Sequence, residues 1–201
     1  MKVTGIKINC RNKRFERGLR TLLCLLIFSL ILHSCINRRS DHVSLYVPEH
    51  GFGINVPGVI DAGTDTVKLN TGVIVKYIWK SFFKTEDNRN IFYNINSTTF
   101  PSHIIHSDSV GLVQLLFNDH EPAYFMNKQY ELLERRDVSR FGYPGASFIW
   151  LNKEDNSHIC NYYYMVENRL YYLSIVLPSW NNKNIKIKNR FIDSFQLINE
   201  S

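Results

Sequence analysis

Four histidines of the chain are candidate ligands for a metal ion. His103 and His106 have two residues between them and Asp108 close behind, while His120 and His158 lie further along. A zinc site needs three or four ligands at stiff local spacing, and neither a CxxC nor an HExxH pattern occurs. The pattern therefore favours scattered surface histidines, and we predict neither a metal site nor a cofactor.

Candidate nucleophiles are equally isolated. Asp65-Thr66 and Asp108-Ser109 each place a hydroxyl beside a carboxylate. Adjacent side chains of a strand point to opposite faces, and such residues at a helix start usually cap it. No nucleophile elbow, P-loop or dinucleotide-binding glycine pattern is present. Cys160 stands alone in an aromatic stretch, which is typical of a buried small apolar residue. We predict no catalytic residue.

Clustered tyrosines are the remaining candidates for a site. Tyr162-Tyr163-Tyr164 and Tyr171-Tyr172 could form a stacking platform for a sugar or a partner. Tyrosine is also a favoured strand residue, and strand alternation places Tyr162 and Tyr164 on the face opposite Tyr163, so some rings must be core. We predict that Tyr162, Tyr164 and Tyr172 belong to a partly exposed rim and form a possible interaction surface.

The N-terminal stretch has the pattern of a secretory signal. The first twenty residues contain seven bases and one acid, and the apolar run Leu22–Leu32 follows. A charged front, a core of 7–15 apolar residues and a small-residue cleavage site define such a signal. The alternative is a permanent membrane helix, but spanning a bilayer takes about 20 apolar residues. The run is too short for that, which favours export.

The charge of the chain belongs to this leader. The whole chain has 24 Lys and Arg against 18 Asp and Glu, a formal charge of +6. Removing the seven bases and one acid of residues 1–34 leaves 17 of each, so the remainder is neutral. The basic balance therefore gives no reason to expect a nucleic-acid partner.

The end of the apolar run, Leu32-His33-Ser34-Cys35, resembles the lipobox of bacterial lipoproteins. The resemblance implies cleavage before Cys35, acylation of Cys35, and attachment to a lipid bilayer in the cell envelope. The residues just after Cys35 lack the acidic cluster that resembles surface-export signals, so we expect the protein to face the periplasm. The alternative is ordinary signal cleavage that leaves Cys35 as a free thiol. We expect a signal peptide over 1–34, a tether over 35–45 and one domain over 46–201.

The domain reads as α+β, an antiparallel sheet with helices packed on it. A helix is expected from Ser107-Asp108, with Pro122 breaking it or starting a second short one. Ile187, Phe191 and Phe195 recur every four residues and predict a closing amphipathic helix over 184–197. The expected strands cover Phe52–Val56, Asp65–Leu69, Val73–Phe83, Ile91–Ser97, Leu132–Val138, Ala146–Leu151, His158–Val166 and Arg169–Leu177.

The order of these elements resembles the PsbP-like α/β/α sandwich domains. The resemblance covers roughly 51–198, and four motifs carry it: Gly53-Ile-Asn-Val-Pro-Gly58, Gly142-Tyr-Pro-Gly145, the hairpin Tyr164–Leu173 with its turn at Glu167-Asn168, and Phe191-Ile-Asp-Ser-Phe195. It implies a fold and no catalytic motif. We therefore expect a non-enzymatic binding or accessory module for an envelope protein. The alternative is an enzyme or small-ligand-binding protein with a site between sheet and helix.

Overall fold

The computed structural model describes residues 42–69, 72–85, 89–125 and 128–198. Described strands form two antiparallel sheets, and two α-helices accompany them, which confirms the predicted α+β class. The elements, in chain order, are β1 (His42–Val47), the 3-10 turn η1 (Pro48–His50), β2 (Phe52–Pro57), β3 (Ile60–Leu69), β4 (Gly72–Lys84), β5 (Asn90–Thr99), α2 (Val110–Phe125), β6 (Tyr130–Arg140), β7 (Tyr143–Asn152), β8 (His158–Val166), β9 (Arg169–Leu177), α3 (Asn182–Asp193) and β10 (Gln196–Leu197).

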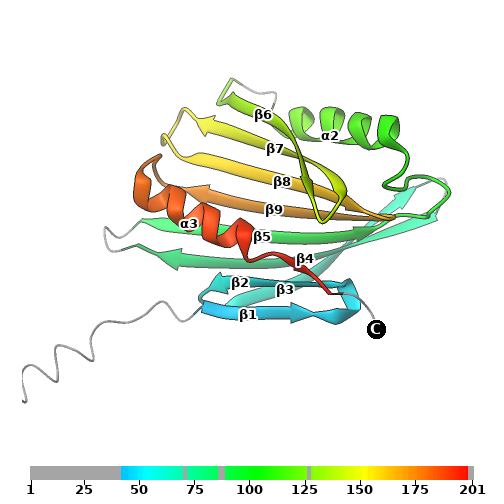
Figure 1. The fold of residues 1–201 in the computed structure, drawn as a ribbon. Coiled ribbons are helices and arrows are strands. Elements are labelled where there is room, and N and C mark those ends of the chain that lie inside the picture. The colour runs from blue at the N-terminus through cyan, green and yellow to red at the C-terminus, as the bar shows by residue number, and fades with distance from the viewer. Residues whose placement is uncertain (1–41, 70–71, 86–88, 126–127, 199–201) are drawn as a thin grey trace, which may run out of the picture. The chain divides into compact units, whose positions relative to one another are not determined.

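The larger sheet has seven strands in the order β3-β4-β5-β9-β8-β7-β6 (Figure 1). Hairpins connect β3 to β4, β4 to β5, β6 to β7, β7 to β8, and β8 to β9. The long excursion through α2 lets β9 return beside β5. Strands β8 and β9 lie inside this order, so both of their faces can be covered, which explains their nearly continuous apolar and aromatic sequence.

One face of the seven-stranded sheet, which we call the α3 face, holds the larger core. Alternate residues of the strands point to it, and α3 together with the small sheet covers it (Figure 1). Phe52 of β2, Leu173 of β9 and Phe195 after α3 are all fully buried there. The rings of Tyr93 and Phe191 meet edge to face at 5.1 Å, which joins β5 to α3.

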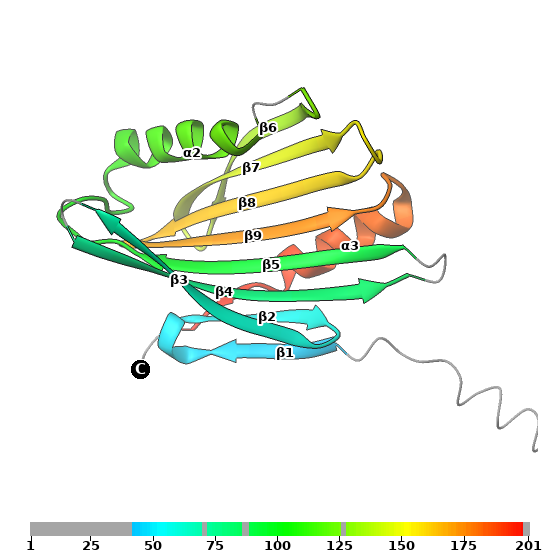
Figure 2. The ribbon, with the colours of Figure 1, turned by 180° about the vertical axis from the view of Figure 1, so that it is seen from behind.

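The opposite face, which we call the α2 face, is covered over only part of its width. Figure 2 shows α2 in front of the sheet on the side of β6, β7 and β8. Val113 and Phe117 of α2 are buried against Phe148, Tyr163 and their neighbours. This core contains no described residue of β3, β4 or β5. On β4 and β5, Phe82 and Phe92 stay exposed on this face.

The smaller sheet has the order β1-β2-β10 and was not expected from the sequence. β1 begins at His42, within the segment 35–45 that we expected to be a tether, and His42 lies opposite Pro57 of β2. Leu45 and Val47 of β1 pack against the α3-face core. The correction has a simple cause: alternation in His42–Val47 is short, and its partner β2 is needed to bury it.

Glycines mark two close approaches in the fold. Gly58, after β2, has φ of +81°, and a Cβ there would lie 2.7 Å from the Phe82 carbonyl oxygen. A Cβ on Gly145 of β7 would collide with the Tyr163 carbonyl oxygen. Two of the motifs that resemble PsbP-like domains therefore contain a glycine that the packing requires.

Helix boundaries differ from prediction. α2 starts at Val110, and its helix continues past Pro122 to Phe125. Pro122 has no N–H, so the helix continues without one i→i−4 hydrogen bond at that position. α3 covers Asn182–Asp193 instead of 184–197, and the Asn181 side chain caps it by accepting from the Asn184 N–H at 2.9 Å. Phe195 lies beyond the helix and is still fully buried.

Candidate functional site

The structure separates the three tyrosines predicted to form one rim. Tyr162 and Tyr164 point to the α3 face, whereas Tyr172 packs against the α2-face core. Only 4% of Tyr164 is exposed, and its ring stacks on Phe195 at 5.9 Å. Because β8 and β9 are covered on both faces, these rings do not make a common interaction surface.

The polar ends of these rings are used inside the fold. The Tyr172 hydroxyl donates to Asn161 Oδ1 at 3.0 Å, and Asn161 is fully buried. Lys188 Nζ of α3 donates to the Tyr162 hydroxyl oxygen at 3.3 Å. Burial raises the pKa of Tyr162 to about 12. The hydroxyls of Tyr162 and Tyr172 therefore each have a structural partner within the fold.

Of the four histidines considered from the sequence, the three whose side chains the structure describes do not converge, and the side chain of His120 lies outside that description. His106 Nδ1 lies 3.3 Å from Asp108 Oδ2, and His103 is exposed on the same loop. The ring of His158 stacks on Trp180 at 5.1 Å, and burial lowers its pKa. Among the described residues, no three histidine, cysteine or acidic side chains are grouped so that they could hold a metal ion.

Cys160 is a buried residue of β8, as the sequence suggested. It is fully buried with a free thiol, and burial raises its pKa to about 12. A thiol held protonated in this way is a poor nucleophile. Cys35, the predicted lipid attachment site, lies outside the described residues. Within the described part of the chain, no helix combines the length and the hydropathy needed to cross a bilayer.

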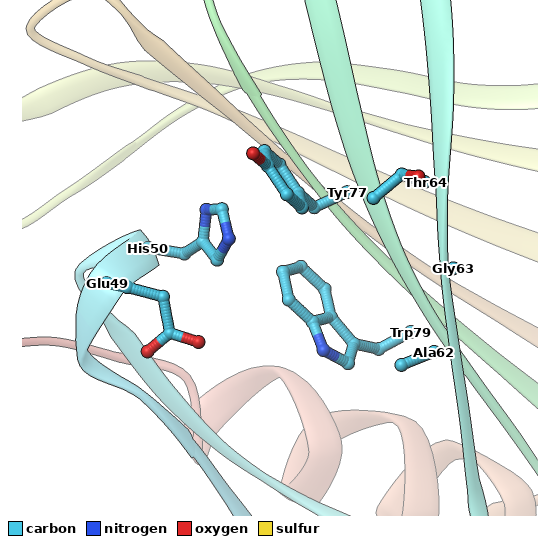
Figure 3. Close-up of a pocket in the computed structure, with 7 residues that line it drawn as sticks. All are labelled: Glu49, His50, Ala62, Gly63, Thr64, Tyr77 and Trp79. Carbon is cyan, nitrogen blue, oxygen red and sulfur yellow. The ribbon is translucent and has the colours of Figure 1, made fainter.

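A hollow that the sequence did not reveal lies between η1 and the β3–β4 hairpin. It has a volume of about 510 Å³, and we call it the ring groove. Figure 3 shows the Glu49 carboxylate and the rings of His50, Tyr77 and Trp79 around one space, with β3 on the opposite side. The residues that line it are Glu49, His50, Ala62, Gly63, Thr64, Tyr77 and Trp79.

The rings of the groove are held against one another. The His50 ring lies 4.0 Å from Tyr77 and 5.2 Å from Trp79, measured between centroids. Trp79 in turn meets Phe52 of the core edge to face at 5.1 Å. The Tyr171 hydroxyl donates to the His50 carbonyl oxygen at 2.7 Å, which fixes the end of η1 on the seven-stranded sheet. The groove is therefore a rigid continuation of the α3-face core.

The electrostatics of the groove leave one formal charge on its wall. Burial and the positive charge of Arg169 lower the pKa of His50, against the opposing effect of Glu49. The imidazole is consequently neutral at pH 7, and the three rings present uncharged π-faces. Glu49 is exposed and supplies a carboxylate beside them.

Strand β3 adds hydrogen-bonding capacity to the groove. It is an edge strand of the seven-stranded sheet, and residues 61–66 are all exposed. Asp61 and Asp65 give this exposed stretch two acids and no base. The Asp65 carboxylate accepts from the Thr66 N–H at 2.9 Å. An edge strand offers backbone donors and acceptors to a further strand.

A second hollow, of about 490 Å³, lies beside the β8–β9 turn. Asn168 of this turn exchanges hydrogen bonds with Phe100, through its side-chain amide at 2.6 Å and its carbonyl oxygen at 2.8 Å. Neither hollow is lined by a residue of α2 or α3, so neither corresponds to the sheet–helix site considered as an alternative from the sequence. The residues that line the second hollow are Gly51, Tyr143, Val166, Glu167, Asn168, Arg169, Tyr171, Leu197 and Ile198.

One signal in the sequence bears on the ring groove. Alternation along the expected strand Val73–Phe83 places Tyr77 and Trp79 on one face, and in the structure both belong to the α3-face core. Nothing in the order of residues links that pair to Glu49 and His50. The link arises only when β2 packs under β4 and carries η1 with it.

Comparisons with known proteins find a likeness of structure. No protein-family model and no curated protein matches the sequence. The solution structure of cyanobacterial PsbP (CyanoP) from Synechocystis sp. PCC 6803 is similar with a TM-score of 0.46 at 11% identity, covering 81% of this chain and 95% of that one. A Pseudomonas aeruginosa protein of unknown function, PA94, described as a putative regulator, gives 0.41 at 10% identity and covers 74% and 88%. A Bacteroides thetaiotaomicron crystal structure gives 0.36 at 11%, covering 80% and 50%.

Proposed function

We propose that this protein is a lipid-anchored binding module of the cell envelope, without enzymatic activity, that recognises a positively charged side chain in an extended segment of a partner protein. The observation that carries this proposal is the ring groove, in which three neutral rings and the Glu49 carboxylate lie next to the free edge strand β3.

The groove is suited to a cation because its parts act together. A cation over an aromatic face gains about 0.5–2 kcal/mol, depending on how far it is desolvated. The neutral His50 adds a third ring without adding a competing charge, and Glu49 supplies the counter-charge. Lysine and arginine side chains meet both requirements. Asp61 and Asp65 on the edge strand lie opposite Lys80 and Lys76, so Glu49 is the charge that selects the cation.

The edge strand determines the form of the partner. An extended segment that pairs with β3 would gain backbone hydrogen bonds, and its alternate side chains would point toward the groove. Backbone pairing supplies affinity and the groove supplies selectivity. The Asp65 contact to the Thr66 N–H occupies one donor, so residues 61–64 are the part of β3 expected to pair.

Attachment to the membrane rests on the lipobox-like segment that ends at Cys35. Each buried methylene contributes about 0.8 kcal/mol, and a single chain holds only marginally. Two or three acyl chains on one cysteine would hold the domain at a bilayer permanently. We expect it to face the periplasm and to act as an accessory to an envelope protein.

The groove can be tested with a defined set of peptides. Strand-forming hexapeptides that differ only in a central Arg, Lys or norleucine would be titrated against the protein. We expect Arg and Lys peptides to bind about fivefold or more tightly than norleucine, the ratio that about 1 kcal/mol of cation–π and ionic attraction gives. Glu49→Gln should remove most of this preference, while Glu131→Gln on β6, outside the groove, should keep it.

Two results would contradict the proposed recognition. One is equal binding of the norleucine and Arg peptides. The other is a preference that survives both Glu49→Gln and His50→Leu. Anchoring is tested separately, because Cys35→Ala should move the protein from the membrane pellet to the soluble fraction, and an unchanged pellet fraction would rule out acylation at that residue.

A further inference from the structure

The register of the strands gathers three exposed apolar residues at one end of the domain. His42, where β1 begins, lies opposite Pro57, and the turn Gly58-Val59 follows directly. Gly58 packs on the Phe82 carbonyl oxygen, and Phe82 lies directly opposite Phe92. Val59, Phe82 and Phe92 therefore lie at the end of the domain where the chain enters β1. We call them the apolar end patch.

The three residues of the apolar end patch are exposed, whereas residues at neighbouring positions of the same sheet face are half-buried. Val59 is 84% exposed, Phe82 60% and Phe92 49%. On the same face and across the neighbouring strands, Phe92 lies opposite Val176, which lies opposite Ile159, and both of these are half-buried. Large apolar side chains that stay in water next to one another indicate a contact surface.

The position of the patch points to what it contacts. Six residues lie between Cys35 and His42, and the seven steps from one Cα atom to the next span at most about 25 Å even when fully extended. If Cys35 is the lipid-attachment site, as proposed above, the entry end of the domain cannot be far from the bilayer. Headgroups and the upper acyl region accept aromatic and aliphatic side chains readily.

We propose that the apolar end patch lies on the bilayer surface and orients the domain, with Val59, Phe82 and Phe92 inserted at the level of the headgroups. This inference rests on the proposed lipid anchor at Cys35. In this orientation the anchor supplies attachment, and the patch restricts rotation of the domain about its tether.

Charge contributes little to this contact. Lys84 and Arg89 lie beside the patch, but the sequence between β4 and β5 also contains Glu86 and Asp87. Lys80 lies opposite Asp61 on β3. Since bases and acids balance, the contact depends on apolar side chains. It should therefore persist on vesicles that lack anionic lipid, unlike a contact made by a polybasic patch.

The test uses the full-length acylated protein in phosphatidylethanolamine–phosphatidylcholine vesicles. Val59→Cys carries an environment-sensitive fluorophore, and His103→Cys is the matched control. His103 is exposed and follows β5, whose first half contains Phe92, so it lies at the other end of that strand. Cys160 is fully buried and does not compete for the label.

We expect the label at position 59 to shift to the blue, to be quenched by nitroxide lipids and to be shielded from iodide. The label at position 103 should show no blue shift and no quenching by nitroxide lipids, and iodide should reach it. Adding Phe82→Ser and Phe92→Ser should remove the shift at position 59 while the protein stays in the membrane pellet.

The outcomes separate this inference from the anchor. An acylated protein that pellets with vesicles but leaves position 59 open to iodide overturns the bilayer contact alone. A label that is shielded from iodide yet unquenched by nitroxide lipids also overturns it, since a protein then covers the patch. A protein without acyl mass that stays off the vesicles refutes the anchor, and the bilayer contact with it.

Discussion

The two faces of the seven-stranded sheet are covered to different extents. The α3 face is covered from β4 to β8 by a helix, by the small sheet and by Phe195. The α2 face is covered by its helix over β7, β8 and the first part of β9, and the outer strands keep Phe82 and Phe92 in solvent. The same strands contribute to both faces. The difference is therefore set by what packs on the sheet: the α3 face holds the larger core, while the α2 face leaves two phenylalanines exposed.

The position of the ring groove follows from this division. It opens where coverage of the α3 face ends, at the β3 edge, and its rings are continuous with the core. A binding surface built on such a support needs little ordering when a ligand arrives, because its side chains are already fixed. The apolar end patch, in contrast, lies on strands without a layer above them.

The largest test of this comparison removes the cover of the α3 face. A chain that ends at Ser179 lacks α3, Phe195 and β10, and we expect it to lose cooperative unfolding and to aggregate. A chain that ends at Ile198 is the control and should unfold cooperatively. Circular dichroism during urea titration would distinguish the two. A soluble, cooperatively unfolding short chain would show that the α3 face does not stabilise the fold.

A single side chain on each face sharpens the comparison. Phe195→Ala should lower the free energy of unfolding by about 3–5 kcal/mol, because a fully buried phenylalanine leaves a cavity. Phe92→Ala on the open part of the α2 face should change it by only about 0.5 kcal/mol. Equilibrium urea denaturation measures both. Similar losses for the two variants would mean that Phe92 is part of a core.

Thiol chemistry gives a third comparison. Cys160 points to the α3 face, and its raised pKa of about 12 keeps the thiol protonated. We expect no reaction with a disulfide reagent at pH 8 in the folded protein and complete reaction in urea. Val59→Cys, in the apolar end patch, should react at once. Rapid reaction of Cys160 without denaturant would indicate that the α3 face opens readily.

The smallest expected effect concerns pH. Burial lowers the pKa of His158 below the ordinary value of 6.5, so the unfolded chain takes up a proton more readily than the folded one. Stability should therefore fall as the pH is lowered through 6.5 toward the folded pKa. His158→Gln should reduce this slope, and His50, whose pKa burial also lowers, should account for part of what remains. The measurement is the urea midpoint at several pH values between 5 and 8.

The sequence predicted most of the large sheet because each of its strands has an apolar and aromatic pattern that can be recognised without knowing its neighbours. β8 and β9 begin and end as expected, since an aromatic run on each side of Glu167-Asn168 reads the same in any context. β1 and β10 were missed because each is short and gains its stability from β2. Local pattern also failed to separate a buried tyrosine from an exposed one, because that depends on which layer covers the strand.

The site was the least predictable part for the same reason. Tyr77 and Trp79 were placed on one face, but the partners that make them a groove are about 30 residues earlier in the chain. The exposure of Phe82 could not be predicted either, because the alternating pattern of β4 is that of any half-buried strand. In both cases the deciding information is which surfaces remain uncovered after packing.

One last consequence follows from the arrangement of the small sheet. β1 and β10 flank β2, with His42 opposite Pro57 at one end and Leu197 opposite Phe52 at the other. The incoming and outgoing polypeptide thus attach to opposite extremities of a single strand. If the domain stands on its entry end, as proposed above, an epitope tag placed after Ile198 should project away from the lipid, where an antibody could reach it without disturbing the attachment.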